Sequence, residues 1–522
     1  MEKLITSSAN KSCSLDLLPT SILKQTLDVH LPTLVSIINA SFASGSFPQQ
    51  LKTATVKPLL KKASVDKDNL QNYRPISNLA YIGKLIEKVA VKRLVDHMQA
   101  HNLEEEMQSA YKPHHCTETA LMKIHDDIGQ AVDQGKGALV LFLDMSAAFD
   151  TVDATILTEI LHTHIGLEGH ALSWFLSYMT GRSHLVKVGN ETSEEVPLQH
   201  GVPQGSVLGP VLFSVYGHPM RTIFKRHGIL YHKYADDTTL YTFYNPAIPG
   251  DLEAARARLI ACFNEVRAWL LTHFLQLNAA KTEFLCILSQ NHLAKYGCEA
   301  IRLGGVPVKA AASVRALGAM LDTHLNMTAQ VNSVICRCNH YIRQIGRIRK
   351  NITTKACHAA IQSLVISKLD YCNVLLTAVP QYQLDRLETV HKRAARLIKR
   401  ADMYCHITQH LYELHWLPIG QRVKFKVLLY VFKALNGLAP SYIADLIKTY
   451  IPGRSLRSAS AGTLLVVPPS KRVIGDRTFS RQAPQLWNAL PKDIRLSQNK
   501  LEFKRRLKTH LFQEHYGQLP HF

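Results

Sequence analysis

The chain has 522 residues, with 61 Lys or Arg and 40 Asp or Glu, which gives a formal net charge of +21. Hydrophobic residues make up 46% of it, and Gly (26) and Pro (22) stay near ordinary levels, so the composition excludes a disordered, collagen-like or low-complexity protein. A positive surplus of this size favours a polyanionic partner, either nucleic acid or an anionic membrane surface.

The first third of the chain mixes helical and strand-like segments. Apolar spacing over residues 79–100 predicts a helix, and a second helix is expected over 117–133 with Thr117 as its N-cap. The run 138–144 is apolar until it ends in Asp144, as in a strand that is buried on both faces. We therefore expect a strand that delivers a carboxylate to the edge of a sheet.

The middle of the chain continues with both element types. Ser146 is the predicted start of a helix, and Trp174 lies within an apolar helix over 171–180. The further predicted elements, in chain order, are a hairpin over 183–199, a loop over 200–206 that leads into an apolar helix, two strands over 229–244, a helix over 251–276, and short β segments near 283–288 and 314–321.

From residue 331 the predicted structure is helical throughout, and two of its helices combine an apolar stripe with a basic ridge. Residues 1–330 carry 30 Lys or Arg and 30 Asp or Glu, whereas residues 331–522 carry 31 and 10. The whole surplus therefore lies in the last part of the chain, which we expect to hold a nucleic-acid backbone. The ridge residues predicted to do so are Arg337, Arg347, Lys392 and Arg396.

The cysteine pattern and the lack of an apolar targeting segment indicate the cellular compartment. No uninterrupted apolar stretch of about 18 residues occurs, and the first residues have no apolar segment typical of a signal peptide. The ten cysteines are scattered, without a CxxC pair, as expected of reduced thiols. We therefore expect an intracellular protein, in the nucleus or the cytoplasm, and nucleic acid as the polyanion.

Two acidic positions are candidates for chemistry. Asp144 ends the apolar strand, and Asp236 and Asp237 lie at the tip of the predicted hairpin. Carboxylates clustered at strand ends repel one another unless a cation joins them, and Mg²⁺ takes oxygen ligands from carboxylates and phosphates. Two such ions about 4 Å apart activate a hydroxyl and stabilise a leaving pyrophosphate. Each position taken alone is better explained by turn chemistry or helix capping than by metal binding.

The order of several motifs decides between these interpretations. The motifs are Asn72–Ser77, Leu143–Asp150, Gly201–Pro210, Tyr234–Asp237, and Leu277–Glu283 followed by Leu317 and Gly318. In this order they resemble the reverse transcriptase of a non-LTR (LINE-type) retrotransposon, with Tyr234–Asp237 similar to its YxDD signature. The resemblance is strong over about residues 50–325 and weaker over 15–50 and 331–510.

The resemblance implies an α+β chain with the right-hand polymerase fold of fingers, antiparallel-sheet palm and helical thumb. We expect an N-terminal helical extension over 1–50, fingers and palm over 51–325, a thumb over 326–400 and a basic helical C-terminal region over 401–522. Only about fifty residues precede the fingers, too few for the upstream endonuclease of full-length relatives, so a truncated element is expected.

The resemblance also implies a metal site. Asp144 and Asp236 would be the ligands of two Mg²⁺ ions, with Mn²⁺ as an alternative, and the Met145 carbonyl would assist. Asp237 would complete the acidic cluster. The catalytic residues predicted in this way are Asp144, Asp236 and Asp237.

Five residues are similarly implied to bind the nucleotide. Phe149 would select dNTP over rNTP by blocking a 2′-hydroxyl, and Gln204 and Gly205 would approach the incoming nucleotide. Lys281 would lie near the leaving pyrophosphate, and Arg74 would hold triphosphate oxygens. The open alternatives are a core role for Phe149 and a solvated side chain for Lys281, and the role of Arg74 transfers less securely because it lies in the fingers motif.

The implied function is an RNA-directed DNA polymerase that extends a primer 3′-hydroxyl with dNTPs by two-metal phosphoryl transfer. Its expected partners are an RNA template, a DNA primer or target DNA, and dNTPs, with no membrane. One alternative is a catalytically idle, retrotransposon-derived protein that binds RNA or DNA. Another is a transcribed relic that never folds stably.

Overall fold

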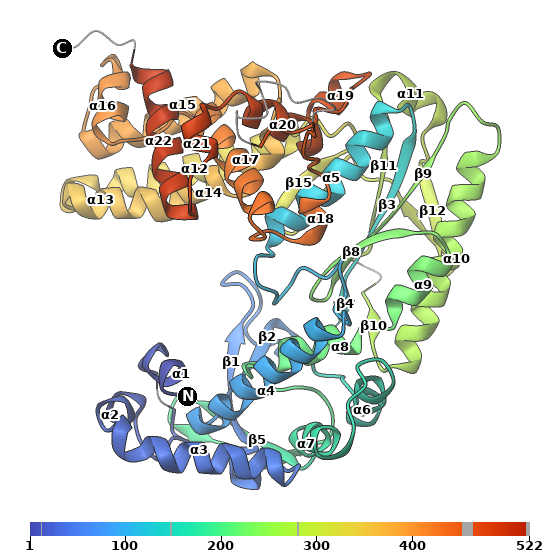
Figure 1. Ribbon diagram of the computed structural model, residues 1–522, viewed down its shortest axis with the longest axis vertical. Coiled ribbons are helices and arrows are strands. Elements are labelled where there is room, and N and C mark those ends of the chain that lie inside the picture. The colour runs from blue at the N-terminus through green and yellow to red at the C-terminus, as the bar shows by residue number, and fades with distance from the viewer. Residues whose placement is uncertain (12, 147–148, 279–280, 452–462, 518–522) are drawn as a thin grey trace. The chain divides into compact units, whose positions relative to one another are not determined.

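The computed structural model describes residues 1–11, 13–146, 149–278, 281–451 and 463–517, and Figure 1 shows its helices and strands. The chain divides into two compact units, each assembled from separate stretches of sequence. The first unit contains Met1–Tyr111, Asp144–Gly228 and Ala261–Lys281, and the second contains Lys112–Leu143, Ile229–Ile260 and Thr282–Phe522. The predicted boundaries at residues 50, 325 and 400 stay a prediction.

The first unit combines helices with a five-stranded mixed sheet and a two-stranded sheet. Its helices are α1 (Glu2–Thr6), α2 (Thr20–Gln25), α3 (Leu27–Ala43), η1 (Gln49–Leu51), η2 (Leu70–Asn72), α4 (Tyr81–Ala100), α6 (Ala154–Thr163), α7 (Gly169–Met179), α8 (Gly209–Tyr216) and α9 (Met220–Arg226). Its strands are β1 (Thr53–Leu60), β2 (Tyr73–Asn78), β4 (Met145–Ser146), β5 (Arg182–Val188), β6 (Glu191–Thr192), β7 (Val196–Leu198) and β10 (Gln276–Leu277).

The sheet of this unit has the order β2-β1-β5-β6, with β7 also on β5. β1 runs antiparallel to β2 and parallel to β5, and the predicted hairpin over 183–199 is confirmed by the antiparallel pairs of β5 with β6 and β7. Beside it lies an aromatic core in which Trp174 and Tyr178 stack at 5.7 Å and Phe47 meets both rings edge-on. Aromatic pairs of this kind add to the area that they bury.

The second unit holds a four-stranded sheet and most of the helices. Its strands are β3 (Gly137–Leu143), β8 (Leu230–Tyr234), β9 (Asp237–Tyr244), β11 (Glu283–Ile287), β12 (Ala300–Leu303), β13 (Val306–Lys309), β14 (Ser313–Ala316) and β15 (Ala319–Asp322). Its helices are α5 (Thr117–Asp133), α11 (Gln290–Tyr296), α12 (Thr328–Ile348), η4 (Arg349–Asn351), α13 (Thr354–Ile361), η5 (Gln362–Ile366), α14 (Ser367–Asp370), η6 (Asn373–Leu376), α15 (Gln381–Lys399), α16 (Ile407–Glu413), α17 (Ile419–Leu435), α18 (Ser441–Ala444), α19 (Val473–Asp476), α20 (Phe479–Asn488), α21 (Lys492–Arg495) and α22 (Lys500–Tyr516). Helix α10 (Asp251–Thr272) contributes to both units.

The antiparallel sheet of this unit has the order β11-β3-β9-β8. β3 lies between two partners, and six of its seven residues are buried, which confirms the doubly buried strand expected from its unbroken apolar run. Helix α5 packs against β3 and β8, and Tyr241 on β9 donates to Asp127 on α5 at 2.7 Å. The predicted α+β class is confirmed.

The other face of α5 receives the C-terminal part of the chain, as the orange and red helices beside it show in Figure 1. Three of its carboxylates are buried there: Glu118 (8% exposed), Asp126 (0%) and Asp133 (8%). Each accepts hydrogen bonds from residues far along the sequence, which are Lys426 and Tyr430 for Glu118, the Ser480 amide for Asp126, and the Lys471 and Arg472 amides for Asp133. Buried carboxylates need such partners, so α5 and residues 426–480 depend on each other.

Two long helices form the segment predicted as a thumb. α12 and α15 pack side by side and run in the same direction, because Arg386 bonds to Asn332 and Arg393 bonds to Asn339. Their predicted apolar stripes are buried at Val331, Val334, Cys338 and Ile345 on α12 and at Leu387, Val390, Ala394 and Ile398 on α15. In the described part of the chain, no helix is both long and apolar enough to cross a bilayer.

Two local predictions were wrong. Thr117 is the first residue of α5, and Cys116 is its N-cap, forming a capping box with Thr119. Ser146 does not begin a helix, because Met145 and Ser146 form strand β4 and pair with β10. Both errors come from hydrogen-bond partners that local propensity does not reveal.

Buried histidines should make the second unit sensitive to acid. Burial lowers the pKa of His125 on α5 to about 4 and of His232 on β8 to about 3, below the value of about 6.5 in an unfolded chain. The unfolded chain therefore binds more protons below pH 6.5, and each histidine removes about 2 kcal/mol of stability by pH 5. We expect a lower unfolding temperature at pH 5 than at pH 7.5, with a smaller difference in His125→Gln; equal temperatures would contradict this.

Candidate active site

The sheet of the second unit sets the positions of the main acidic residues. Leu143 at the end of β3 pairs with Thr238, and Tyr234 pairs with Asp237 across the β8–β9 turn. β3 and this turn therefore end at the same edge of the sheet, and Asp144 is the next residue of the chain after β3. The sheet register thus brings Asp236 and Asp237 to the edge of the sheet at which β3 ends.

The turn between β8 and β9 has only two residues. Ala235 and Asp236 form it, and Ala235 has a φ of +58°, in the left-handed region that non-glycine residues rarely adopt. Left-handed residues give two-residue hairpin turns a twist that matches the flanking strands. Asp236 in the turn is half-buried and Asp237, the first residue of β9, is exposed, so two consecutive carboxylates lie at this end of the sheet.

The first unit places Asp144 beside Lys281. Lys281 Nζ lies 2.8 Å from Asp144 Oδ2, and the Asp144 side chain is 22% exposed. The backbone holds the same region, because the Asn278 amide donates to the Asp144 carbonyl at 2.9 Å and Met145 pairs with Leu277. Two residues predicted for different roles are therefore an ion pair, and Asn278 is a structural contributor that the motif comparison did not single out.

No preassembled metal-ligand group is present in the part of the chain that the structure describes. There, no cluster of three or more His, Cys, Asp or Glu side chains is arranged to hold a metal ion. The ammonium group of Lys281 supplies the positive charge beside Asp144. The carboxylate therefore already attracts a cation at this position.

The predicted nucleotide-pocket motif forms a loop that leads into α8. Gln204 Nε2 donates to both oxygens of Asp150 at 3.0 and 3.1 Å, and the Ser77 amide donates to the Gln204 carbonyl at 2.7 Å. Burial raises the pKa of Asp150, and the Gln204 bond opposes that shift. These residues line a cavity of about 250 Å³ between the loop and the β1–β2–β5 sheet.

The loop is anchored from behind by a buried carboxylate. Glu87 on α4 is 1% exposed and accepts from the Val207 and Leu208 amides at 2.5 and 3.3 Å, and Tyr178 donates to its other oxygen at 3.2 Å. Burial raises the pKa of Glu87. The sequence analysis missed this residue, because a single Glu on an otherwise amphipathic helix gives no signal of a distant partner.

Gly205 is required by its surroundings. Its φ is +129°, and a Cβ atom there would lie 2.3 Å from the Ser77 carbonyl oxygen. Gly205→Ala is therefore expected to displace the loop and to lower nucleotide incorporation at least about tenfold, since small misplacements of a reacting group are costly. Gly189→Ala is the matched control, because Gly189 also has a positive φ (+61°) but meets no atom within 4 Å. Equal incorporation by both variants would contradict this expectation.

Phe149 and Arg74, both predicted to bind the nucleotide, differ in their exposure to solvent. Phe149 is half-buried, its ring packs on Phe213 of α8 at 4.7 Å, and its carbonyl accepts from the Val202 amide at 2.8 Å. Arg74 is exposed on β2, where it pairs with Leu59 of β1. Phe149 is thus held next to the loop that contains Gln204, whereas the Arg74 side chain is exposed to solvent.

The predicted nucleic-acid-binding residues differ in exposure. Arg347 is exposed, while Arg337 and Lys392 are half-buried, with Arg337 bonded to Ser333 at 2.8 Å. Arg396 is held inward, because one of its Nη atoms bonds to the Cys405 carbonyl at 3.4 Å and its Nε is buried without a partner. A phosphate-binding role suits Arg347 best and Arg396 least.

The class of protein follows from comparison with known families. The family model described as reverse transcriptase (RNA-dependent DNA polymerase) matches residues 60–321, and the chain belongs to this family. The right-hand polymerase fold and the resemblance to non-LTR retrotransposon reverse transcriptases are thereby confirmed. The match includes the β3 edge, the β8–β9 turn and the Gly205 loop.

Three of the curated relatives come from mobile elements of Drosophila melanogaster. The chain is 25% identical to the probable RNA-directed DNA polymerase from transposon X-element, over 77% of this chain and 44% of that protein. It is 27% identical to the one from transposon BS, over 71% and 41%, and 26% identical to the polymerase from mobile element jockey, over 61% and 34%. The chain thus matches less than half the length of these relatives.

Solved structures of telomerase are also similar. The apo telomerase of Candida tropicalis gives a TM-score of 0.40 at 10% identity, covering 75% of this chain and 67% of that one. Telomerase of Candida albicans in complex with a fragment of telomeric RNA gives 0.35 at 11% identity, covering 73% and 66%.

Proposed function

We propose that this chain is an RNA-directed DNA polymerase that extends a primer 3′-hydroxyl with dNTPs. The observation that carries the proposal is the sheet register that ends β3 and the β8–β9 turn at one edge, with Asp144 and the Asp236–Asp237 pair at those ends. Membership in the reverse transcriptase family supports this assignment, and the polymerases named among the relatives agree with it.

The donor chemistry fits divalent metal ions. Asp144 and Asp236 would hold two Mg²⁺ ions, or Mn²⁺ in their place, with the Met145 carbonyl and Asp237 assisting. When bound, such ions activate the primer hydroxyl and stabilise the pyrophosphate that leaves. The ion pair of Asp144 with Lys281 supports the fit, because a carboxylate that pairs with an ammonium group also suits a metal ion.

The chain's own residues would position the nucleotide. Gly205 lets the loop backbone approach closely, and Gln204 is oriented by its two bonds to Asp150. Phe149 would contact the sugar, Arg74 would bind triphosphate oxygens, and Lys281 would donate to the leaving phosphate. These five roles are part of the proposal.

The template–primer would lie along the basic helices. Arg337, Arg347, Lys392 and Arg396 are proposed to contact phosphates, which fix position without reading sequence. An RNA template and a DNA primer or target are the proposed partners. Binding that weakens steeply with salt is expected, because phosphate contacts release counterions.

Primer extension by the purified chain tests the proposal. We expect incorporation of dNTPs on an RNA template with a DNA primer and Mg²⁺, and its loss when EDTA removes the metal. A DNA template of the same sequence is the comparison for template class. Salt-sensitive binding of the primer–template without any extension would overturn the proposal and favour a retrotransposon-derived binding protein instead.

A further inference from the structure

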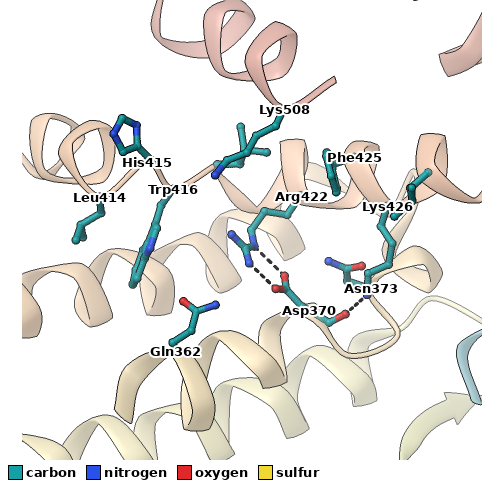
Figure 2. Close-up of a pocket in the computed structure, with 12 residues that line it drawn as sticks. Gln362, Asp370, Asn373, Leu414, His415, Trp416, Arg422, Phe425, Lys426 and Lys508 are labelled. Carbon is teal, nitrogen blue, oxygen red and sulfur yellow. Dashed lines mark hydrogen bonds and ion pairs between the residues drawn. The ribbon is translucent and has the colours of Figure 1, made fainter. Parts of the chain in front are cut away.

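The second unit contains a cavity that the polymerase mechanism does not use. It has a volume of about 400 Å³, within the range of small-molecule sites. Figure 2 shows its lining, which comes from η5, α14, η6, the α16–α17 connection, α17 and α22. All of these elements belong to residues 331–522, the segment that carries the positive surplus of the chain.

The cavity combines an apolar wall with a cationic lining. Its apolar residues are Leu414, Trp416, Leu417, Phe425 and Leu429. Its charged residues are Arg422, Lys426 and Lys508, against one carboxylate, Asp370. Asp370 is neutralised, because Arg422 binds it through two nitrogens, and Lys426 donates to its backbone carbonyl (Figure 2). Lys426 is also paired with Glu118 at 3.2 Å, so Lys508 is the lining cation whose charge no carboxylate of the lining offsets. The lining therefore favours a largely apolar ligand with one anionic group.

Polar groups in the cavity add hydrogen-bonding capacity. Asn373 is 2% exposed, and its Oδ1 atom is buried without a hydrogen-bond partner. Gln362 adds a second amide at the start of η5, a π-helical turn, and such turns are frequent at functional sites. A buried acceptor without a partner is costly, so a ligand that donates to Asn373 would recover that cost.

Aromatic groups complete the wall. The Trp416 ring stacks on His391 at 4.9 Å and also lines the cavity, which fixes its orientation. Phe425 on α17 is half-buried, and Lys508 on α22 is exposed. A rigid aromatic wall, amide groups and an exposed cation are the features that bind a base, its polar edge and its phosphate.

We infer that this cavity binds one nucleotide unit, with the base against Trp416 and Phe425 and the phosphate at Lys508. An aliphatic anion would satisfy the cations but would leave Asn373 without a partner. The inference rests on the proposed nucleic-acid function, because that function places RNA near the basic segment. The nucleotide can come from an RNA strand or from free solution, since the chemistry is the same.

Photo-cross-linking tests this with the full chain. A short single-stranded RNA that carries 4-thiouridine is expected to cross-link to peptides containing Trp416 or Phe425. Phe425→Ala should reduce this cross-link and weaken RNA binding at least about fivefold, as loss of one stacking side chain does. Lys508→Glu should do the same and keeps the test valid if Phe425→Ala fails to fold. Lys504→Glu is the matched control for Lys508→Glu, because Lys504 is an exposed lysine one turn away on α22 that does not line the cavity.

The arms of the experiment separate the outcomes. Free UMP that competes as well as RNA identifies free nucleotide as the source, whereas competition by RNA alone identifies a strand, and both support the inference. Cross-links confined to other peptides, or binding of dodecanoate but not of either nucleotide probe, would overturn it. Primer extension by the wild-type chain without a cavity cross-link refutes only this inference, and a cross-link without extension refutes only the proposed polymerase.

Discussion

Asp236→Asn is expected to reduce dNTP incorporation at least about 10³-fold on an RNA template with Mg²⁺. Asn has nearly the same shape as Asp and suits the same tight turn after Ala235, so the β8–β9 hairpin should persist. What is lost is the negative charge that would hold a divalent ion. The measurement is single-nucleotide primer extension under conditions where the wild-type chain is active.

The control for this variant is a surface carboxylate. Asp96→Asn removes the same charge from α4. Asp96 forms an ion pair with Lys92, and the two side chains are 56% and 72% exposed. Such exposed ion pairs contribute little to stability. Asp96→Asn should keep the wild-type rate and unfolding temperature. If Asp236→Asn also kept the wild-type rate, the assignment of the metal site to the β8–β9 turn would be wrong.

Removal of the C-terminal region has the second large expected effect. A chain that ends at Arg400 would leave Glu118, Asp126 and Asp133 of α5 without their partners from residues 426–480. The face of α5 that these residues cover would become open to water, and the loss of its buried apolar surface is large against a domain stability of only about 5–15 kcal/mol. We expect the second unit to lose cooperative unfolding, measured by circular dichroism and by the solubility of the expressed chain.

Two controls bracket that experiment. A chain that ends at Gly517 keeps every element of the second unit through α22 and should unfold like the full chain. Asp126→Ala removes one carboxylate and leaves the Ser480 amide without its acceptor, so it should lower stability by about 2 kcal/mol without abolishing folding. A shortened chain that ended at Arg400 and still unfolded cooperatively at the wild-type temperature would show that α5 does not need these partners.

Periodicity and motif order predicted the parts of the molecule that depend on local sequence. The apolar run before Asp144 became the doubly buried strand β3, and the stripes of α12 and α15 became buried faces, because burial follows residue spacing directly. The motif order led to the reverse transcriptase family, which the family model confirms for residues 60–321.

Contacts between segments that lie far apart in the sequence could not be predicted from periodicity or motif order. The pairing of β4 with β10 converts a predicted helix start at Ser146 into a strand. The ion pair of Lys281 with Asp144 joins residues 137 positions apart, and Glu87 meets Val207 across 120. From the sequence alone, the carboxylates of α5 would be assigned to the solvent-exposed face of the helix. Nothing in the local sequence indicates that a later segment covers them.

The partners of α5 also have an order of appearance during synthesis. Asp133 leaves the ribosome 338 residues before Lys471, whose amide it binds. At about 5–20 residues per second, the helix waits roughly 20–70 s for that partner. Throughout this interval its buried face must be shielded by chaperones or by transient contacts, so the second unit can reach its final structure only after Ser480 has been synthesised.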